Sequence, residues 1–332
     1  MTSSRPLITP SNASRLKQVG RLGPELKAST AVSGQRLAFS PQGSVVLALA
    51  LGGTPLRWWD VGAPPGGPRG THEPRSAVEA AVLPDAEHIV TVGPASLSPA
   101  GLWRPRLVSL STKDGTLTRE HHLSNAVTRF SMSGGGEWLL LMPLDGESPL
   151  VWDVKAWRPL CEFTPLDMGV HVSSCALSPD GRFAAATFSA DDGRSGNLWL
   201  WAVGEGAQPV VLSIDAPTLW SLAFHPTEPL LVVGGSTEEV AVVDLRERRL
   251  VKMLPGFVGY TCNLSFNPQG DLLIASWDGR GFGVHRFDTG EEVFHFSDGD
   301  DLNASDALFS PDGRLVAWGQ GDGTVALWGV ED

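Results

Sequence analysis

The chain has 332 residues and a formal net charge of −12, with 42% apolar and 19% charged residues, as in a folded protein rather than a disordered one. The acidic balance argues against nucleic acid as a partner, because binding to phosphates needs a positive footprint. The longest apolar run, residues 45–51, is too short to cross a bilayer, so no membrane partner is expected.

Cysteine usage and the N-terminus indicate the compartment. The three cysteines, Cys161, Cys175 and Cys262, are far apart and form neither a disulfide framework nor a zinc pattern. The first twenty residues hold no apolar segment long enough for a secretory signal. We therefore expect a cytoplasmic protein, and the excess of arginine over lysine suggests a bacterial source.

In chain order, a polar leader comes first and one repeated unit follows. Residues 1–14 are predicted to be a flexible leader and residues 15–332 a single domain. In each unit an apolar pair of residues is followed by a turn that usually contains a proline. The proline position is occupied by Pro41, Pro84, Pro179, Pro226, Pro268 and Pro311, and in the third unit we assign it to Met132. Successive gaps are 42 to 48 residues, which is the period of a repeat protein.

A second landmark keeps the same phase. The third apolar run of each unit ends near an aromatic residue or a valine: Trp59, Val108, Trp152, Trp201, Val243, Phe287 and Trp328. From each of the first six to the next proline position there are 24 to 27 residues. Two landmarks that hold phase through seven units indicate a true repeat, and the aromatic members are predicted to fill the space between units.

Each unit contains four strand-like runs, as the fifth unit shows. Its runs 219–224, 230–235, 240–245 and 250–254 are apolar or β-branched and are separated by turn residues. Four antiparallel strands repeated seven times predict an all-β fold, a seven-bladed β-propeller. The blades are expected to start near residues 35, 78, 126, 173, 219, 261 and 304.

The repeated motifs carry a family resemblance. Ser-Pro-Asp-Gly turns are accompanied by Trp-Asp at 59–60 and 152–153 and by Asp-Gly at 192–193, 278–279 and 322–323. In these motifs the chain, from about residue 30 to 332, is similar to the WD40 family. That family often has a Gly-His pair whose histidine bonds to the turn aspartate. No Gly-His pair occurs here, so this network around Asp192, Asp278 and Asp322 is expected to be partial or absent.

The chain stops after the third strand of the last blade, which leaves that blade one strand short. An open ring would expose unpaired strand edges. The repeat phase places the missing strand near residues 18–28, and we predict that this N-terminal strand completes the last blade. A disordered leader is the alternative.

One position on each innermost strand is predicted to ring a mouth of the central channel. These positions are Arg36, Glu79, Val127, Ser174, Ser221, Asn263 and Asp306. Their mixture of opposite charges favours paired charges over a substrate cage, and small-molecule binding in the channel stays open. We expect Arg36, Glu79 and Asp306 to contribute to partner binding.

Two further surface features are candidate docking sites. Residues 93–106 are an insertion in the second blade that holds Trp103, flanked by Arg104 and Arg106. An exposed tryptophan beside arginines suits a protein interface, whereas a loop folded back on the blade would use Trp103 as a cap on the sheet. Both interpretations remain open.

The second feature is an acidic cluster near the C-terminus. It contains Asp298, Asp300, Asp301 and Asp306. We favour solvated charge, then contact with a basic partner, and only then calcium, because the spacing does not match a twelve-residue calcium loop.

No catalytic, metal-binding or cofactor-binding set is visible in the sequence. The histidines form no metal-ligand spacing, and the glycines at 134–136 lack the rest of a phosphate-binding motif. We therefore predict a non-catalytic platform that binds one or more unidentified proteins without a cofactor, through rim loops and the channel mouth. The alternative is a propeller-type hydrolase or lactonase with its active site in the channel, for which Glu79 and Asp306 are the candidate ligands.

Overall fold

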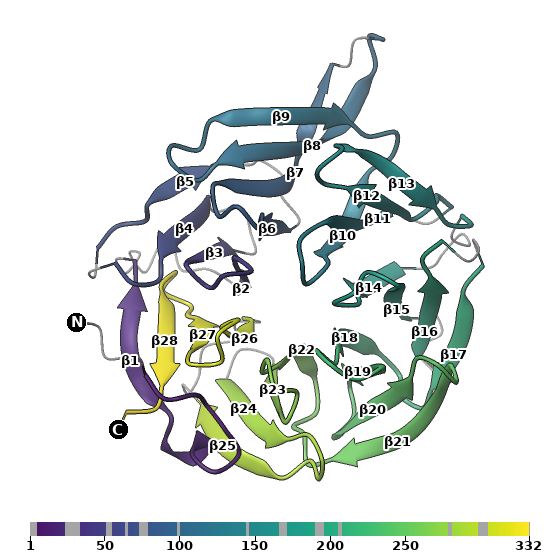
Figure 1. Cartoon of the computed structure of the whole chain (residues 1–332). Helices are drawn as coiled ribbons and strands as arrows, with labels where there is room; N and C mark the ends of the chain where they lie inside the picture. The colour runs from purple at the N-terminus through teal and green to yellow at the C-terminus, as the bar shows by residue number, and fades with distance from the viewer. Residues whose placement is uncertain are drawn as a thin grey trace.

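The computed structural model describes residues 5–23, 34–50, 55–63, 66–72, 79–97, 100–143, 146–165, 171–189, 196–204, 208–277, 281–297 and 305–331. Within these ranges the chain forms seven four-stranded antiparallel sheets arranged in a ring (Figure 1). The fold is the predicted seven-bladed β-propeller, and the only helical element in these ranges is the short 3-10 turn η1 (Ala13–Arg15).

The first four blades follow the chain from the centre of the ring outward. Blade one contains β2 (Gln35–Phe39), β3 (Val45–Ala50), β4 (Leu56–Asp60) and β5 (Gly70–His72). Blade two contains β6 (Ala80–Val82), β7 (His88–Leu97), β8 (Trp103–Ser111) and β9 (Leu117–His122). Blade three contains β10 (Val127–Met132), β11 (Trp138–Pro143), β12 (Leu150–Asp153) and β13 (Arg158–Glu162). Blade four contains β14 (His171–Leu177), β15 (Phe183–Ser189), β16 (Gly196–Ala202) and β17 (Val210–Ile214).

The last blade differs from the others in the origin of its outer strand. Blade five contains β18 (Leu219–Phe224), β19 (Leu230–Gly235), β20 (Glu239–Asp244) and β21 (Arg249–Pro255). Blade six contains β22 (Thr261–Phe266), β23 (Leu272–Trp277), β24 (Gly281–Arg286) and β25 (Glu292–Ser297). Blade seven contains β26 (Ala307–Phe309), β27 (Val316–Gly319), β28 (Val325–Gly329) and, outermost, β1 (Lys17–Leu22).

The N-terminal strand therefore closes the ring, as predicted. β1 pairs antiparallel with β28, from Lys17 opposite Gly329 to Leu22 opposite Val325, and the two strands lie side by side in Figure 1. The expected closing segment ran to residue 28, and its part after Gly23 lies outside the described residues.

Side-chain packing between neighbouring blades forms the core. The buried apolar residues fall into seven clusters, each shared by two adjacent blades, so both faces of each sheet are covered. The aromatic residues that end the third strands are buried as predicted: Trp59, Trp152, Trp201, Phe287 and Trp328. Burial of one such ring contributes roughly 1.5–3 kcal/mol, which makes these positions principal contacts between blades.

The Ser-Pro-Asp-Gly turn joins the first two strands of a blade for a clear physical reason. In blade four the Ser178 hydroxyl accepts a hydrogen bond from the Phe183 N–H at 2.9 Å, and Gly181 has φ 66°. Glycine is favoured there because a side chain is strained at positive φ.

In blade three the assignment of the proline position to Met132 was wrong. Ser133 closes that turn, since its hydroxyl accepts from the Trp138 N–H at 3.1 Å and the Gly136 N–H donates to its carbonyl at 2.9 Å. Gly134 therefore occupies the proline position, two residues later than predicted, and the glycine run 134–136 is the turn itself.

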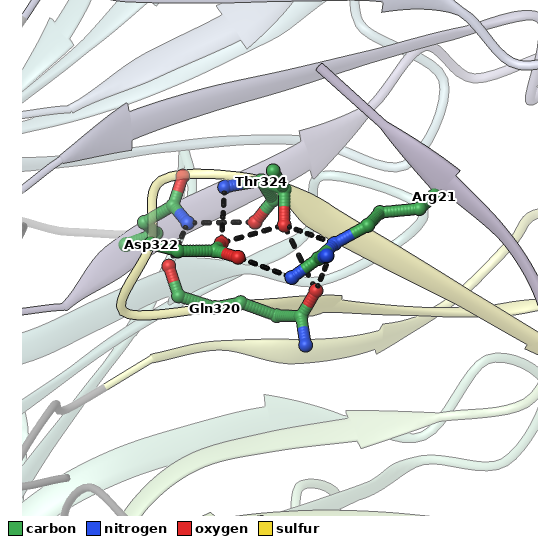
Figure 2. Close-up of polar contacts among 5 residues, drawn as sticks. Arg21, Gln320, Asp322 and Thr324 are labelled. Atoms are coloured by element: carbon green, nitrogen blue, oxygen red, sulfur yellow. Dashed lines mark hydrogen bonds and ion pairs between the residues drawn. The ribbon is translucent and has the colours of Figure 1, made fainter. Parts of the chain in front are cut away.

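In blade seven an arginine from β1 bonds to the turn aspartate, in the place of the histidine that the WD40 motif has and this sequence lacks. The Arg21 guanidinium forms an ion pair with Asp322, and its Nε donates to Thr324 Oγ1 at 2.8 Å and to Gln320 Oε1 at 2.9 Å (Figure 2). The network expected to be partial or absent around Asp322 is thus present with a different donor, one that comes from the opposite end of the chain. Asp192 and Asp278 lie outside the described residues.

Part of the expected leader is packed in the structure. Ile8 and Ala13 are fully buried in the cluster between blades six and seven, together with Leu16, and the Ile8 N–H donates to the Gly313 carbonyl at 2.8 Å. The sequence predicted a flexible leader here because its composition is mostly polar. Its few apolar side chains instead pack against blade seven. The domain boundary at residue 15 stays a prediction.

Candidate functional site

One end of the central channel forms a cavity of about 430 Å³. Its lining comes from the N-terminal ends of the innermost strands and the residues just before them: Arg36, Arg129, Val172, Ser173, Trp220, Tyr260, Cys262 and Asp306. All these strands start at the same end of the ring, so the cavity is a channel mouth built by six of the seven blades. A volume of this size is within the usual range of ligand pockets, about 300–1,000 Å³.

β-Bulges decide which side chains face this cavity. The innermost strands of blades three to six each carry one extra residue near their start, at Thr128, Ser173, Trp220 and Cys262. An extra residue shifts the alternation of side chains by one position. Three of these four bulge residues consequently line the mouth.

The predicted ring of channel positions was therefore right in blades one and seven and wrong in blades three to six. Arg36 and Asp306 line the cavity, but Val127 is buried in the core between blades two and three. Ser221 is also buried, and its hydroxyl donates to the Thr261 carbonyl at 3.1 Å. The strand period alone does not show a bulge, and for this reason it predicted Val127 and Ser221 at the mouth instead of Arg129 and Trp220.

Arg36 and Asp306 form an ion pair that bridges blades one and seven. Arg36 Nη1 lies 3.1 Å from Asp306 Oδ1, and the Leu37 N–H donates to Asp306 Oδ2 at 3.0 Å. Burial raises the pKa of Asp306, while Arg36 and the Leu37 N–H oppose that rise. Both carboxylate oxygens are thus bonded within the ring, and the group acts as a staple between blades.

Glu79 makes a similar bridge between blades two and three. Its carboxylate accepts a hydrogen bond from the Phe130 N–H and lies 3.9 Å from Arg129 Nε. Burial raises the pKa of Glu79 to about 7, against the opposing effects of the Phe130 N–H, Arg129 and Arg36. The paired charges expected at this mouth are present, although Glu79 itself does not line the cavity.

Two stacked aromatic rings form one wall of the cavity. The Trp220 and Tyr260 rings lie 5.2 Å apart at 22°, and Tyr260 is 58% exposed. Tyr260 has φ 69°, in the left-handed region that side chains other than glycine rarely adopt. A strained backbone that presents an exposed ring is a feature typical of binding sites.

The insertion in blade two is a β-hairpin extension rather than a loop. Ser96 pairs with Arg104 and Leu97 with Trp103, so β7 and β8 continue past the start of β6, where Ala80 pairs with Thr91. The hairpin leaves blade two at the end of the blade where β6 starts, the same end as the cavity, and projects beyond the ring in Figure 1.

The arginines of this hairpin are held by local contacts. Arg104 Nη1 donates to the Ser124 carbonyl, and Arg106 Nη1 lies 2.9 Å from Glu120 Oε2. Trp103 belongs to β8 by its backbone, while its side chain lies outside the described residues, so neither interpretation of Trp103 is tested.

The other candidate residues and any metal site can be assessed only in part. Asp298, Asp300 and Asp301 lie outside the described residues, and only Asp306 of the acidic cluster has a described environment. Among the residues that the structure describes, no group of three or more His, Cys, Asp or Glu side chains could hold a metal ion. The described helical content also includes no segment long and apolar enough to span a membrane.

Comparisons with known proteins agree with the fold. No protein-family model matches the chain. It is similar to the protein groucho of Drosophila melanogaster, with 25% identity over 158 residues that cover 43% of this chain and 21% of groucho. It is also similar to WD repeat-containing protein SL1-17 of Schistosoma mansoni, with 23% identity over 149 residues that cover 45% of this chain and 49% of that protein. The matches thus span less than half the length of each relative.

These similarities join the phased turns and the seven-bladed ring as evidence for one family. In its repeats and its ring of blades the chain resembles WD40-repeat proteins. A propeller of this kind is a fold that suits a protein-interaction scaffold. The bacterial source and cytoplasmic location stay predictions.

Proposed function

We propose that this propeller is a non-catalytic docking platform, cytoplasmic in location, that binds a protein partner at the channel mouth and the adjacent β7–β8 hairpin. The observation that carries the proposal is the cavity with its exposed, stacked Trp220–Tyr260 wall. Large aromatic side chains with one exposed face are frequent anchors of protein interfaces.

The charged residues at the mouth favour binding over catalysis. Asp306 and Glu79 each accept a hydrogen bond from a backbone N–H group of the neighbouring blade. These bonds connect the blades to one another. A hydrolase would need such carboxylates free to hold a metal or to move a proton. Nothing in the described residues or the comparisons supports the hydrolase alternative.

Affinity purification of the tagged protein from its native host, with quantitative mass spectrometry, tests the platform. The wild-type protein is expected to recover at least one partner in stoichiometric amount, and Tyr260→Ala, at the exposed mouth, is expected to lose it. Val211→Ala is the matched control, because Val211 is similarly exposed at 51% but lies on the outer strand β17.

Two results would contradict the proposal. One is a wild-type purification that returns no stoichiometric protein. The other is a partner that both the Tyr260→Ala variant and the Trp103→Ala variant of the hairpin still bind. Binding would then use neither the channel mouth nor the hairpin.

A further inference from the structure

The channel mouth is more positive than the molecule as a whole. The chain carries a net charge of −12, yet the charged residues that line the described cavity are Arg36, Arg129 and Asp306. Two cations against one anion make this lining an exception on an acidic protein, and local charge of this kind selects partners of opposite sign.

The anionic groups at the mouth lie deeper than the cations. The Asp306 side chain is 7% exposed and the Glu79 side chain 20%, whereas those of Arg36 and Arg129 are 32% and 31% exposed. Both acids also bond to backbone N–H groups, as described above. A ligand that enters the mouth therefore meets guanidinium groups rather than carboxylates.

Both arginines have hydrogen-bond donors that have no partner among the described residues. Arg129 donates from Nε to the Ser173 carbonyl at 3.1 Å and from Nη1 to the Thr128 carbonyl at 2.8 Å, which leaves Nη2 without a partner among the described residues. Arg36 uses only Nη1, for Asp306. None of the remaining nitrogens is a buried unpaired atom, so they are open to solvent and to a ligand.

The backbone carbonyls that hold Arg129 also orient it. Two of its nitrogens are fixed by β10 and β14, so less side-chain freedom is lost when the third binds an anion. A pre-oriented guanidinium suits a carboxylate, because its remaining donors form charge-assisted hydrogen bonds, which are stronger than neutral ones.

The aromatic wall supplies the second half of the recognition surface. Trp220 and Tyr260 both line the same cavity as the two arginines, and the exposed Tyr260 ring offers apolar area that no described residue covers beyond the stack on Trp220. An apolar side chain packed on this pair would bury area on both partners.

We propose that the mouth binds an extended segment of the partner protein in which an Asp or Glu lies within three residues of an aromatic or large aliphatic side chain. The carboxylate bonds to Arg129 and Arg36, and the apolar side chain packs on the Trp220–Tyr260 pair. This inference rests on the proposed docking function and adds the chemistry of the bound segment.

Selection from a random dodecapeptide library displayed on phage tests the ligand class with the full-length protein. The enriched peptides are expected to share an acidic residue next to a large apolar one. Enrichment of basic or uncharged sequences, or no enrichment at all, would overturn the inference.

One enriched peptide is then synthesised, and its affinity is measured by isothermal titration calorimetry. Replacement of its Asp by Asn, or its Glu by Gln, is expected to weaken binding at least tenfold and leaves the protein unaltered. Arg129→Gln is expected to have a similar effect, and Tyr260→Ala to weaken binding severalfold. Arg158→Gln, an exposed arginine on β13, is the control that should bind as the wild type does.

The outcomes separate this inference from the docking function. Suppose that Tyr260→Ala loses a stoichiometric partner, but that neither the amide replacement in the peptide nor Arg129→Gln in the protein changes the affinity of the peptide. This result would refute the carboxylate chemistry and would still support the docking function. Absence of any partner in the host would refute the platform, whatever the peptides do.

Discussion

Among single residues, Ala86 occupies a conformation that favours glycine. It ends the turn between β6 and β7 with φ 54°, where the corresponding turns of blades one and seven have Gly43 and Gly313. Ala86→Gly is expected to raise the free energy of unfolding by about 1 kcal/mol, because an alanine in this region is strained by roughly that amount. Urea denaturation of both proteins measures the difference.

A second alanine provides the control for that substitution. Ala38 lies on β2 and packs against the same apolar cluster as Ala86, but its φ is not positive. Ala38→Gly is expected to lower the free energy of unfolding by about 0.5–1 kcal/mol, as for glycine in a strand. If both substitutions destabilise the protein, strain at Ala86 is not the explanation.

Glu79 is expected to make stability depend on pH. Its pKa is raised by burial to about 7 from an ordinary value of 4.5, so the folded protein binds a proton that the unfolded chain has lost between these pH values. The stability contributed by Glu79 is therefore complete below about pH 4.5 and falls as pH rises through 7. Arg129, Arg36, Asp306 and Cys175 are the other titratable groups that act on this carboxyl.

Glu79→Gln removes this titration and keeps an acceptor for the Phe130 N–H. The wild type should be the more stable of the two near pH 5 and should lose that advantage by pH 8, by roughly 1–3 kcal/mol in total. Urea denaturation at pH 5, 6, 7 and 8 measures the change. Parallel stability curves would show that Glu79 does not titrate in this range.

The closing strand β1 depends on one polar cluster. Arg21 holds Asp322, Thr324 and Gln320 of the β27–β28 turn, and these groups are partly buried. Arg21→Gln is expected to cost about 1 kcal/mol, since hydrogen bonds to a charged group contribute more than an exposed ion pair. Faster amide hydrogen exchange should be confined to β1 and its partner strand β28.

The comparison for this element is Lys17, whose ion pair with Glu331 is exposed on both sides, at 57% and 51%. Lys17→Gln is expected to change stability and exchange little, because exposed pairs of this kind contribute almost nothing. Equal effects of the two substitutions would mean that the charge of β1, rather than the cluster around Asp322, holds the strand.

The strands and their order followed from sequence because turn chemistry and apolar runs repeat locally. The blade count, the aromatic residues between blades and the closing strand all depend on such spacing, as Trp59 and Trp152 show. The bulge at Trp220 was not predicted, because one extra residue changes the direction in which a side chain points without altering the composition of the strand. The contact of Arg21 with Asp322 also escaped, because it joins residues that are 301 positions apart.

For the whole molecule, the site follows from the ring rather than from any one blade. Arg36, Arg129, Trp220 and Asp306 come from four different blades and meet only because the ring is closed. The repeat phase predicted Arg36 and Asp306 at the mouth. The same phase did not group them with the aromatic wall, since that grouping depends on the bulged strands.

The pairing of β1 with β28 has a consequence for biosynthesis. The ribosome makes β1 long before β28, so β1 has no partner strand until β28 has left the exit tunnel. Blades one to six can form while translation continues, but the circle can be completed only after β28 has emerged. A chain cut short by a premature stop would thus keep an unpaired terminal strand at one end and an incomplete sheet at the other, both open to aggregation or to a chaperone.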